Sequence, residues 1–130
     1  LICGLLFSGI SSIKALSEEE PTRELFNALS ILPRDSIVLS HNSNNYWIGY
    51  AGMGSVSEDV EVEKLFGTRD FNLATDILNR NNIQYILITS KMRHGLVWSD
   101  EEEGLLFLLK YSEEFEKVYE EDVGVWEYSG

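Results

Sequence analysis

The sequence predicts an α/β domain: a mixed sheet of about four or five strands with packed helices and a C-terminal β-hairpin. Several segments place apolar residues at helical spacing, and short apolar, β-branched runs lie between them. The last two strand-like segments are joined by an acidic turn, which is typical of a hairpin. With 130 residues, of which 44% are hydrophobic, the chain is long enough to bury one core.

Helices are predicted over 21–32, 46–51, 71–80 and 105–109. In the first, Leu25, Leu29 and Leu32 fall on one face, so this face is expected to pack on a core. Asp70 is a good N-cap for the third helix. The spacing Ser99-x-x-Glu102 predicts a capping box before the fourth.

Strands are predicted over 36–40, 56–62, 83–89, 115–119 and 123–128. The run 83–89 is the clearest of them because it is apolar and bounded by turn residues. The strand pattern of segment 56–62 is weaker than that of the other segments. Its valines Val60 and Val62 alternate with acidic residues, which favours a half-exposed strand or sheet edge.

The chain is strongly acidic, and this excludes some classes of partner. Ten Lys and Arg residues against 22 Asp and Glu residues give a formal net charge of −12. Nucleic acid is therefore not an expected partner, because binding its phosphates needs a cationic surface. The single cysteine, Cys3, excludes an internal disulfide and any zinc site with several cysteines.

Residues 1–16 differ in character from the rest of the chain. The first 13 are uncharged and apolar all round a helix, which favours the end of a transmembrane helix or hydrophobic stub. A signal-peptide core and a first helix of the domain are the alternatives. The composition changes sharply at Ser17, so we predict one α/β domain over 17–130.

Few residues suggest catalysis, metal binding or ligand binding. The glycines Gly49, Gly52 and Gly54 are interpreted as turn residues, because no phosphate-binding helix is predicted to follow them. His41 and His94 are interpreted as loop or surface residues, and the acidic runs as solvated faces and helix starts. Trp98 is expected in the core or at its edge, with contact to a sugar or membrane surface as the alternative.

The loop 41–45 is the best candidate for a ligand contact. It follows the C-terminal end of the first predicted strand, where open α/β sheets place ligand sites. His41, Asn44 and Asn45 could bind a polar ligand there, and Tyr46 and Trp47 could supply an apolar wall. The alternative is a turn whose Asn side chains bond its own backbone.

Several of these segments resemble a known family. Leu32-Pro33-x-Asp35 with the strand 36–40, then Tyr46-Trp47-Ile48-x-Tyr50 and later Ser57-Glu58-Asp59, are similar to the C-terminal domain of archaeal multispanning glycosyltransferases of the GT-C type. The pattern resembles the oligosaccharyltransferase catalytic subunit in particular. Segments 82–87, 115–119 and 124–128 are similar to the closing strands of such domains. Where that family has Trp-Trp-Asp-Tyr-Gly, which recognises an Asn-x-Ser/Thr acceptor, this chain has the sequence of loop 41–45.

The resemblance implies a function for the whole parent protein. It implies a noncatalytic, extracytoplasmic domain of a cell-membrane enzyme that transfers sugar from a polyprenyl-phosphate donor such as dolichyl phosphate. The catalytic acidic residues would lie in the membrane portion of the same chain, so no catalytic residue is assigned here. No cofactor or metal ligand is expected in this chain, and a divalent-cation requirement of the parent stays open. The alternative is an extracytoplasmic interaction or ligand-binding module anchored by one helix.

Overall fold

The structure is a computed structural model that describes residues 19–57, 59–121 and 123–129. Its longer helices are α2 (Glu19–Ser30), α3 (Asn45–Tyr50), α4 (Val60–Gly67), α5 (Phe71–Arg80) and α6 (Leu105–Tyr111). Two short helical turns, η1 (Asn42–Asn44) and η2 (Met92–Leu96), follow strands. The strands are β1 (Ile37–Leu39), β2 (Gly54–Ser55), β3 (Tyr85–Ile88), β4 (Phe115–Glu120) and β5 (Gly124–Tyr128).

The strands form one mixed, five-stranded sheet in the order β2-β1-β3-β5-β4. Strand β1 pairs in parallel with both β2 and β3, whereas β5 runs antiparallel to β3 and to β4. The fold class predicted from the sequence, including the C-terminal hairpin, is therefore confirmed.

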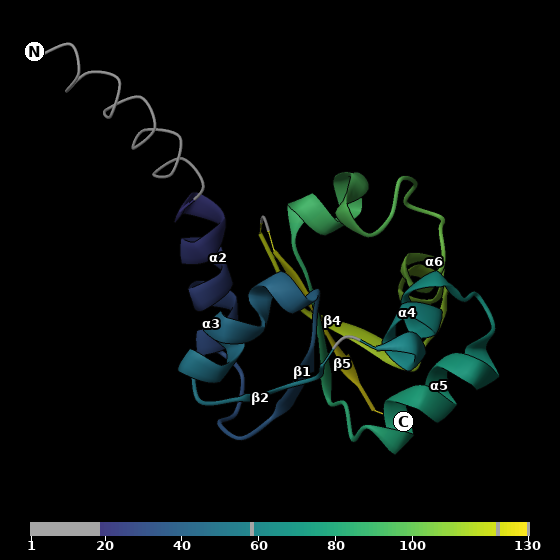
Figure 1. Cartoon of the computed structure of the whole chain (residues 1–130), viewed down its shortest axis with the longest axis horizontal. Coiled ribbons are helices and arrows are strands. Elements are labelled where there is room, and N and C mark those ends of the chain that lie inside the picture. The colour runs from purple at the N-terminus through teal and green to yellow at the C-terminus, as the bar shows by residue number, and fades with distance from the viewer. Residues whose placement is uncertain (1–18, 58, 122, 130) are drawn as a thin grey trace, which may run out of the picture.

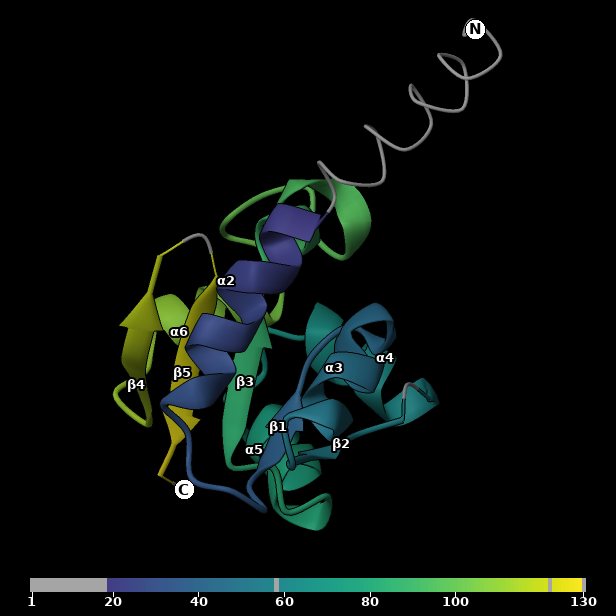
Figure 2. The ribbon, with the colours of Figure 1, turned by 90° about the vertical axis from the view of Figure 1, so that its left-hand side faces the viewer.

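Helices cover both faces of the sheet (Figure 1). Helices α2 and α3 pack on one face, and α2 crosses in front of the strands when the molecule is turned (Figure 2). Helices α4, α5 and α6 pack on the other face. Strand side chains alternate between the two layers: Leu87 and Val125 face α2, while Ile86 and Trp126 face α6.

Most predicted elements are present within one or two residues of their expected bounds. Leu25, Leu29 and Leu32 are buried against the sheet, as their spacing predicts. Asp70 caps α5 by accepting hydrogen bonds from the backbone N–H groups of Asn72 and Leu73. Of the three glycines interpreted as turn residues, only Gly52 lies in the turn after α3, with φ +91°, a conformation that favours glycine; Gly49 lies within α3 and Gly54 begins β2.

The predicted strand over 56–62 is wrong. Strand β2 is shorter and earlier, and helix α4 begins at Val60. Asp59 caps this helix by accepting a hydrogen bond of 3.0 Å from the N–H of Val62. Val62, Leu65 and Phe66 then form one buried face, so the alternation of valines and acids belongs to a helical pattern that continues past the predicted strand.

The predicted capping box over 99–102 is also wrong. Helix α6 begins after Gly104, and the partner of Ser99 is Glu103, whose Oε1 accepts from the Ser99 N–H at 3.0 Å. This bond closes the loop before α6. Glu102 instead accepts a hydrogen bond of 2.7 Å from Lys110 within the last turn of α6.

The predicted membrane stub over 1–16 and Cys3 lie outside the described residues. In the part of the chain that the structure describes, no helix is both long and apolar enough to cross a membrane.

Candidate functional site

The carboxyl ends of β1 and β3 meet at one edge of the sheet because these neighbouring strands are parallel. The chain leaves β1 toward α3 on one face and leaves β3 toward η2 and α6, the latter on the other face. In open α/β sheets, ligands bind at such a point of divergence. In Figures 1 and 2, η2 and the Glu19 end of α2 lie on the same side of the molecule.

Met92 connects the two segments that leave this edge. Its side chain is fully buried, and its Sδ accepts hydrogen bonds from Ser40 Oγ at 3.5 Å and from the Thr89 N–H at 3.4 Å. Asn44 Nδ2 lies 3.8 Å from the same sulfur and donates to Ser40 Oγ at 2.9 Å. The space between the ends of β1 and β3 is thus filled by the protein's own groups, which hold the loop after β1 against the turn after β3.

Loop 41–45 forms η1 and the first residue of α3. His41 caps the turn, since its Nδ1 accepts from the Ser43 N–H at 3.2 Å and lies 2.8 Å from Ser43 Oγ. Asn45 Nδ2 donates to the Val56 carbonyl at 3.1 Å and ties the loop to the segment after β2. The Asn45 Oδ1 atom is buried without a hydrogen-bond partner in the described structure.

The aromatic residues of α3 stand beside this loop. Trp47 is half-buried, and its ring meets those of Phe26, Tyr46 and Tyr50 edge-on at centroid distances of 5.3, 4.9 and 6.3 Å. Tyr46 is 70% exposed and Tyr50 73% exposed. The first turn of α3 therefore presents a phenol ring next to the polar loop.

A small pocket of about 230 Å³ borders the loop on the α4 side. Its polar lining comes from His41, Glu63 and Glu103, and its apolar lining includes Phe66 and Leu96. The two carboxylates and the imidazole suit a polar or cationic ligand group rather than an anion.

The five candidate residues lie in one continuous segment, and in the structure they have two kinds of role. Asn44 and Asn45 are bonded inward, whereas His41 and Tyr46 have surface that a ligand could reach and Trp47 supports the Tyr46 ring. Ser40, Thr89 and Met92 were missed by the sequence analysis. The signal that could have found them is the parallel pairing of the two apolar strands, whose ends must lie side by side.

The segment after β3 is a tight turn and not an open loop. His94 Nδ1 lies 2.7 Å from the Ser90 carbonyl oxygen, and Gly95, at φ +116°, donates to the Trp98 carbonyl at 2.8 Å. Trp98 is 1% exposed, and its Nε1 donates to the Phe66 carbonyl at 2.7 Å. Contact of Trp98 with a sugar or a membrane surface is therefore excluded, and its placement in the core is confirmed.

Metal ligands are not grouped anywhere in the described ranges 19–57, 59–121 and 123–129, where no three His, Cys, Asp or Glu side chains could hold one ion. His41 and His94 belong to the two different segments that leave β1 and β3, and each bonds within its own turn.

No family model matches this chain, and no curated protein matches it in sequence. Solved structures do match. One is the crystal structure of the C-terminal globular domain of an oligosaccharyltransferase from Archaeoglobus fulgidus, with a TM-score of 0.68 and 14% identity. That match covers 83% of this chain and 96% of the solved domain.

A second oligosaccharyltransferase C-terminal globular domain from Archaeoglobus fulgidus matches with a TM-score of 0.51 and 16% identity, over 88% of this chain and 94% of that one. The resemblance inferred from the sequence is thus confirmed at the level of the fold: this chain has the fold of the C-terminal globular domains of archaeal oligosaccharyltransferases.

Proposed function

We propose that this chain is the noncatalytic C-terminal domain of a membrane glycosyltransferase that uses a polyprenyl-phosphate sugar donor. In this proposal the domain lies on the extracytoplasmic side, packs on the membrane portion of the same protein and helps to shape access of the acceptor. The observation that carries the proposal is the fold match over 96% of a solved oligosaccharyltransferase domain.

The position of the candidate site supports this role. The carboxyl edge of β1 and β3 lies on the same side of the molecule as the Glu19 end of α2 (Figure 2). If residues 1–16 end a transmembrane helix, the chain enters the domain at this side. The loop 41–47 would then be directed toward the membrane portion, where a lipid-linked donor must be held.

The loop divides into residues that hold it and residues that a ligand could reach. Asn44 and Asn45 use their amide N–H groups on Ser40 and Val56, so their main effect is on the position of the loop. His41 and Tyr46 are placed to contact the acceptor, with Trp47 as the wall behind Tyr46. We assign no catalytic residue and no cofactor to this chain.

Acceptor kinetics of the full-length membrane protein test this proposal. Tyr46→Ala and His41→Ala should raise the acceptor concentration at half-saturation several-fold and leave that of the donor unchanged. Tyr50→Ala is the matched control, because Tyr50 lies one turn further along α3 and is equally exposed. Tyr50→Ala should leave the half-saturation concentrations of the acceptor and of the donor unchanged.

Asn44→Ala and Asn45→Ala separate the two interpretations of the loop. If it is only a turn, each change should lower the free energy of unfolding by a few tenths to ~1 kcal/mol without altering acceptor kinetics. If it positions the acceptor contacts, acceptor half-saturation should also rise. Unaltered acceptor kinetics in all four variants would remove the loop from the site.

The number of membrane spans in the full-length protein tests the parent enzyme class. Many spans before this domain agree with a multispanning glycosyltransferase. A single span would overturn the proposal in favour of an anchored interaction or ligand-binding module.

A further inference from the structure

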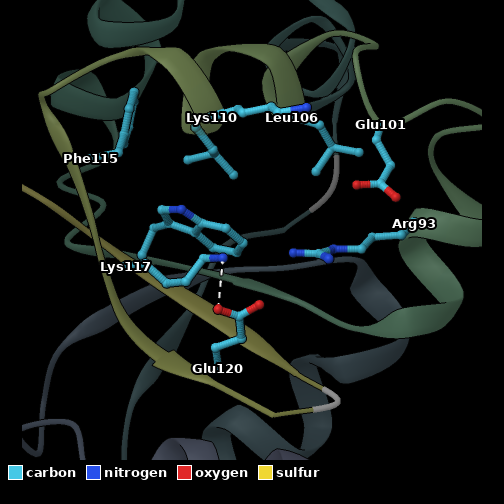
Figure 3. Close-up of a pocket in the computed structure, with 9 residues that line it drawn as sticks. Arg93, Glu101, Leu106, Lys110, Phe115, Lys117 and Glu120 are labelled. Carbon is cyan, nitrogen blue, oxygen red and sulfur yellow. Dashed lines mark hydrogen bonds and ion pairs between the residues drawn. The ribbon is translucent and has the colours of Figure 1, made fainter.

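A second pocket, of about 360 Å³, lies between α6 and the β4–β5 hairpin (Figure 3). It is separate from loop 41–47 and plays no part in the proposed function. Three of the chain's ten Lys and Arg residues line it, namely Arg93, Lys110 and Lys117. The carboxylates of Glu101 and Glu120 also line it, so the lining carries one more positive than negative charge in a protein whose formal net charge is −12.

Strand pairing builds the floor of this pocket. Trp126 of β5 is directly opposite Lys117 of β4, so the two side chains lie on the same face of the sheet. The Lys117 Nζ is 5.1 Å from the indole centroid and 3.0 Å from Glu120 Oε1. The register shifts between Lys117 and Tyr119, an irregularity of the kind that often lies beside binding sites.

Gly124 leaves room for the indole and for Arg93. A Cβ at this position would lie 2.7 Å from Cζ3 of Trp126 and 3.5 Å from Nη2 of Arg93. Any larger residue would therefore push the ring away from the sheet. The Arg93 guanidinium reaches the pocket from η2, with its Cζ 5.6 Å from the indole centroid.

Arg93 differs from the other two cations of the pocket. Lys110 is paired with Glu102 at 2.7 Å and Lys117 with Glu120 at 3.0 Å. Among the described residues, none forms an ion pair or a hydrogen bond with the Arg93 guanidinium. This half-buried group points into the pocket with unused N–H donors whose planar arrangement matches a carboxylate or phosphate (Figure 3).

We propose that the pocket formed by Arg93, Lys117 and Trp126 binds the carboxylate or phosphate group of a small organic anion. Arg93 donates hydrogen bonds to the anion, and Lys117, whose charge is shared with Glu120, contributes a further N–H donor. The apolar part of the ligand contacts Trp126 of the floor, and Leu106 and Phe115 form the apolar wall (Figure 3). The volume suits a molecule of about the size of an aromatic phosphate monoester.

Nuclear magnetic resonance of the indole N–H groups tests this site in the 130-residue chain. Phenyl phosphate and benzoate are the anionic probes, and benzyl alcohol is the neutral probe. Each anion should shift the Trp126 indole signal saturably, while benzyl alcohol should not. The Trp98 signal should stay in place with every probe, because its N–H is buried and bonded to Phe66.

Two arginine variants make the test specific. Arg93→Gln should weaken binding of the anions about tenfold or more, since it removes a charge-assisted hydrogen-bond donor. Arg34→Gln makes the same charge change away from the pocket lining and should leave binding unchanged. The proposal is overturned if neither anion shifts the Trp126 signal saturably, if benzyl alcohol binds equally well, or if Arg34→Gln weakens binding as much as Arg93→Gln.

Discussion

Gly104 shows how one residue joins two parts of the core. It has φ +54°, and an added Cβ would overlap the carbonyl oxygen of Phe66 and lie 3.0 Å from the Cα of Gly67. The same Phe66 oxygen accepts the indole hydrogen bond of Trp98. A small residue is therefore required for the start of α6 to approach the end of α4.

Gly104→Ala should lower the free energy of unfolding by about 2–4 kcal/mol, through backbone strain and displacement of the Phe66 carbonyl. Chemical denaturation measures this change. Gly67→Ala is the control, because a Cβ there meets nothing within 4 Å, and its effect should be below about 1 kcal/mol. Equal effects of the two changes would show that the contact at Gly104 is unimportant.

The ion pair of Glu102 and Lys110 makes a pH-dependent contribution to the stability of the folded protein. The hydrogen bond from Lys110 holds the Glu102 pKa below its ordinary value of 4.5, and Glu102 raises the pKa of Lys110. Because the folded-state pKa of Glu102 is lowered, its contribution to stability is present above pH 4.5 and is lost as the pH falls through the lowered value.

Carbon resonances of the Glu102 carboxyl group, followed against pH, measure this pKa. In the Lys110→Gln variant the midpoint should move up toward the ordinary glutamate value, since the main cause of the lowering is removed. An unchanged midpoint would mean that the pair does not form in solution.

The hydrogen-bond contacts of Met92 could not be predicted from the sequence. A methionine after an apolar strand indicates only burial. Two of the three hydrogen-bond contacts of its sulfur come from Ser40 and Asn44, which are distant in sequence and meet it only because β1 and β3 pair in parallel.

At the scale of elements, the sequence predicts best where one pattern dominates. The uniformly apolar run of β3 and the one-sided leucines of α2 have a single structural interpretation. Residues 56–62 do not, because Val60 and Val62 fit both a strand and a helix over so short a window. The Asp59 cap and the later buried residues Leu65 and Phe66 decide in favour of α4.

Asp59→Ala should therefore destabilise α4 and lower the free energy of unfolding by about 1 kcal/mol. Hydrogen exchange of the first backbone amides of α4, especially that of Val62, should become faster. Glu63→Ala removes the same charge from the exposed first turn of the helix without removing the cap, and it should change stability by less than about 0.5 kcal/mol. Similar effects of both changes would point to charge alone and not to the cap.

At the scale of the whole molecule, two helical layers enclose the sheet, and both layers contribute to the core. The mixed sheet with packed helices and the C-terminal hairpin is the arrangement predicted from the order of elements, whereas the coverage of both faces is not part of that prediction. The site could be predicted only as a position, the loop after the first strand. Which of its side chains face inward depends on Val56 and Met92, whose proximity to the loop no local pattern reveals.

A chain of residues 17–130 should fold on its own, because the described core is built from residues 25 to 126. Circular dichroism should show an α/β spectrum with one cooperative thermal transition. The same fragment should neither transfer nor hydrolyse sugars from a lipid-phosphate donor. A disordered spectrum would contradict the single-domain account, and measurable turnover would contradict the noncatalytic role.

Photo-crosslinking of an acceptor to the full-length protein tests the central claim most directly. An acceptor that carries a photoreactive group would be bound, irradiated and mapped by mass spectrometry, with the same irradiation in excess unlabelled acceptor as the control. We predict adducts within loop 41–47, at His41 or Tyr46, that the unlabelled acceptor suppresses. Adducts confined to the membrane portion, or equally frequent at Tyr50 and on the far helices of the domain, would contradict a role of this loop in acceptor access.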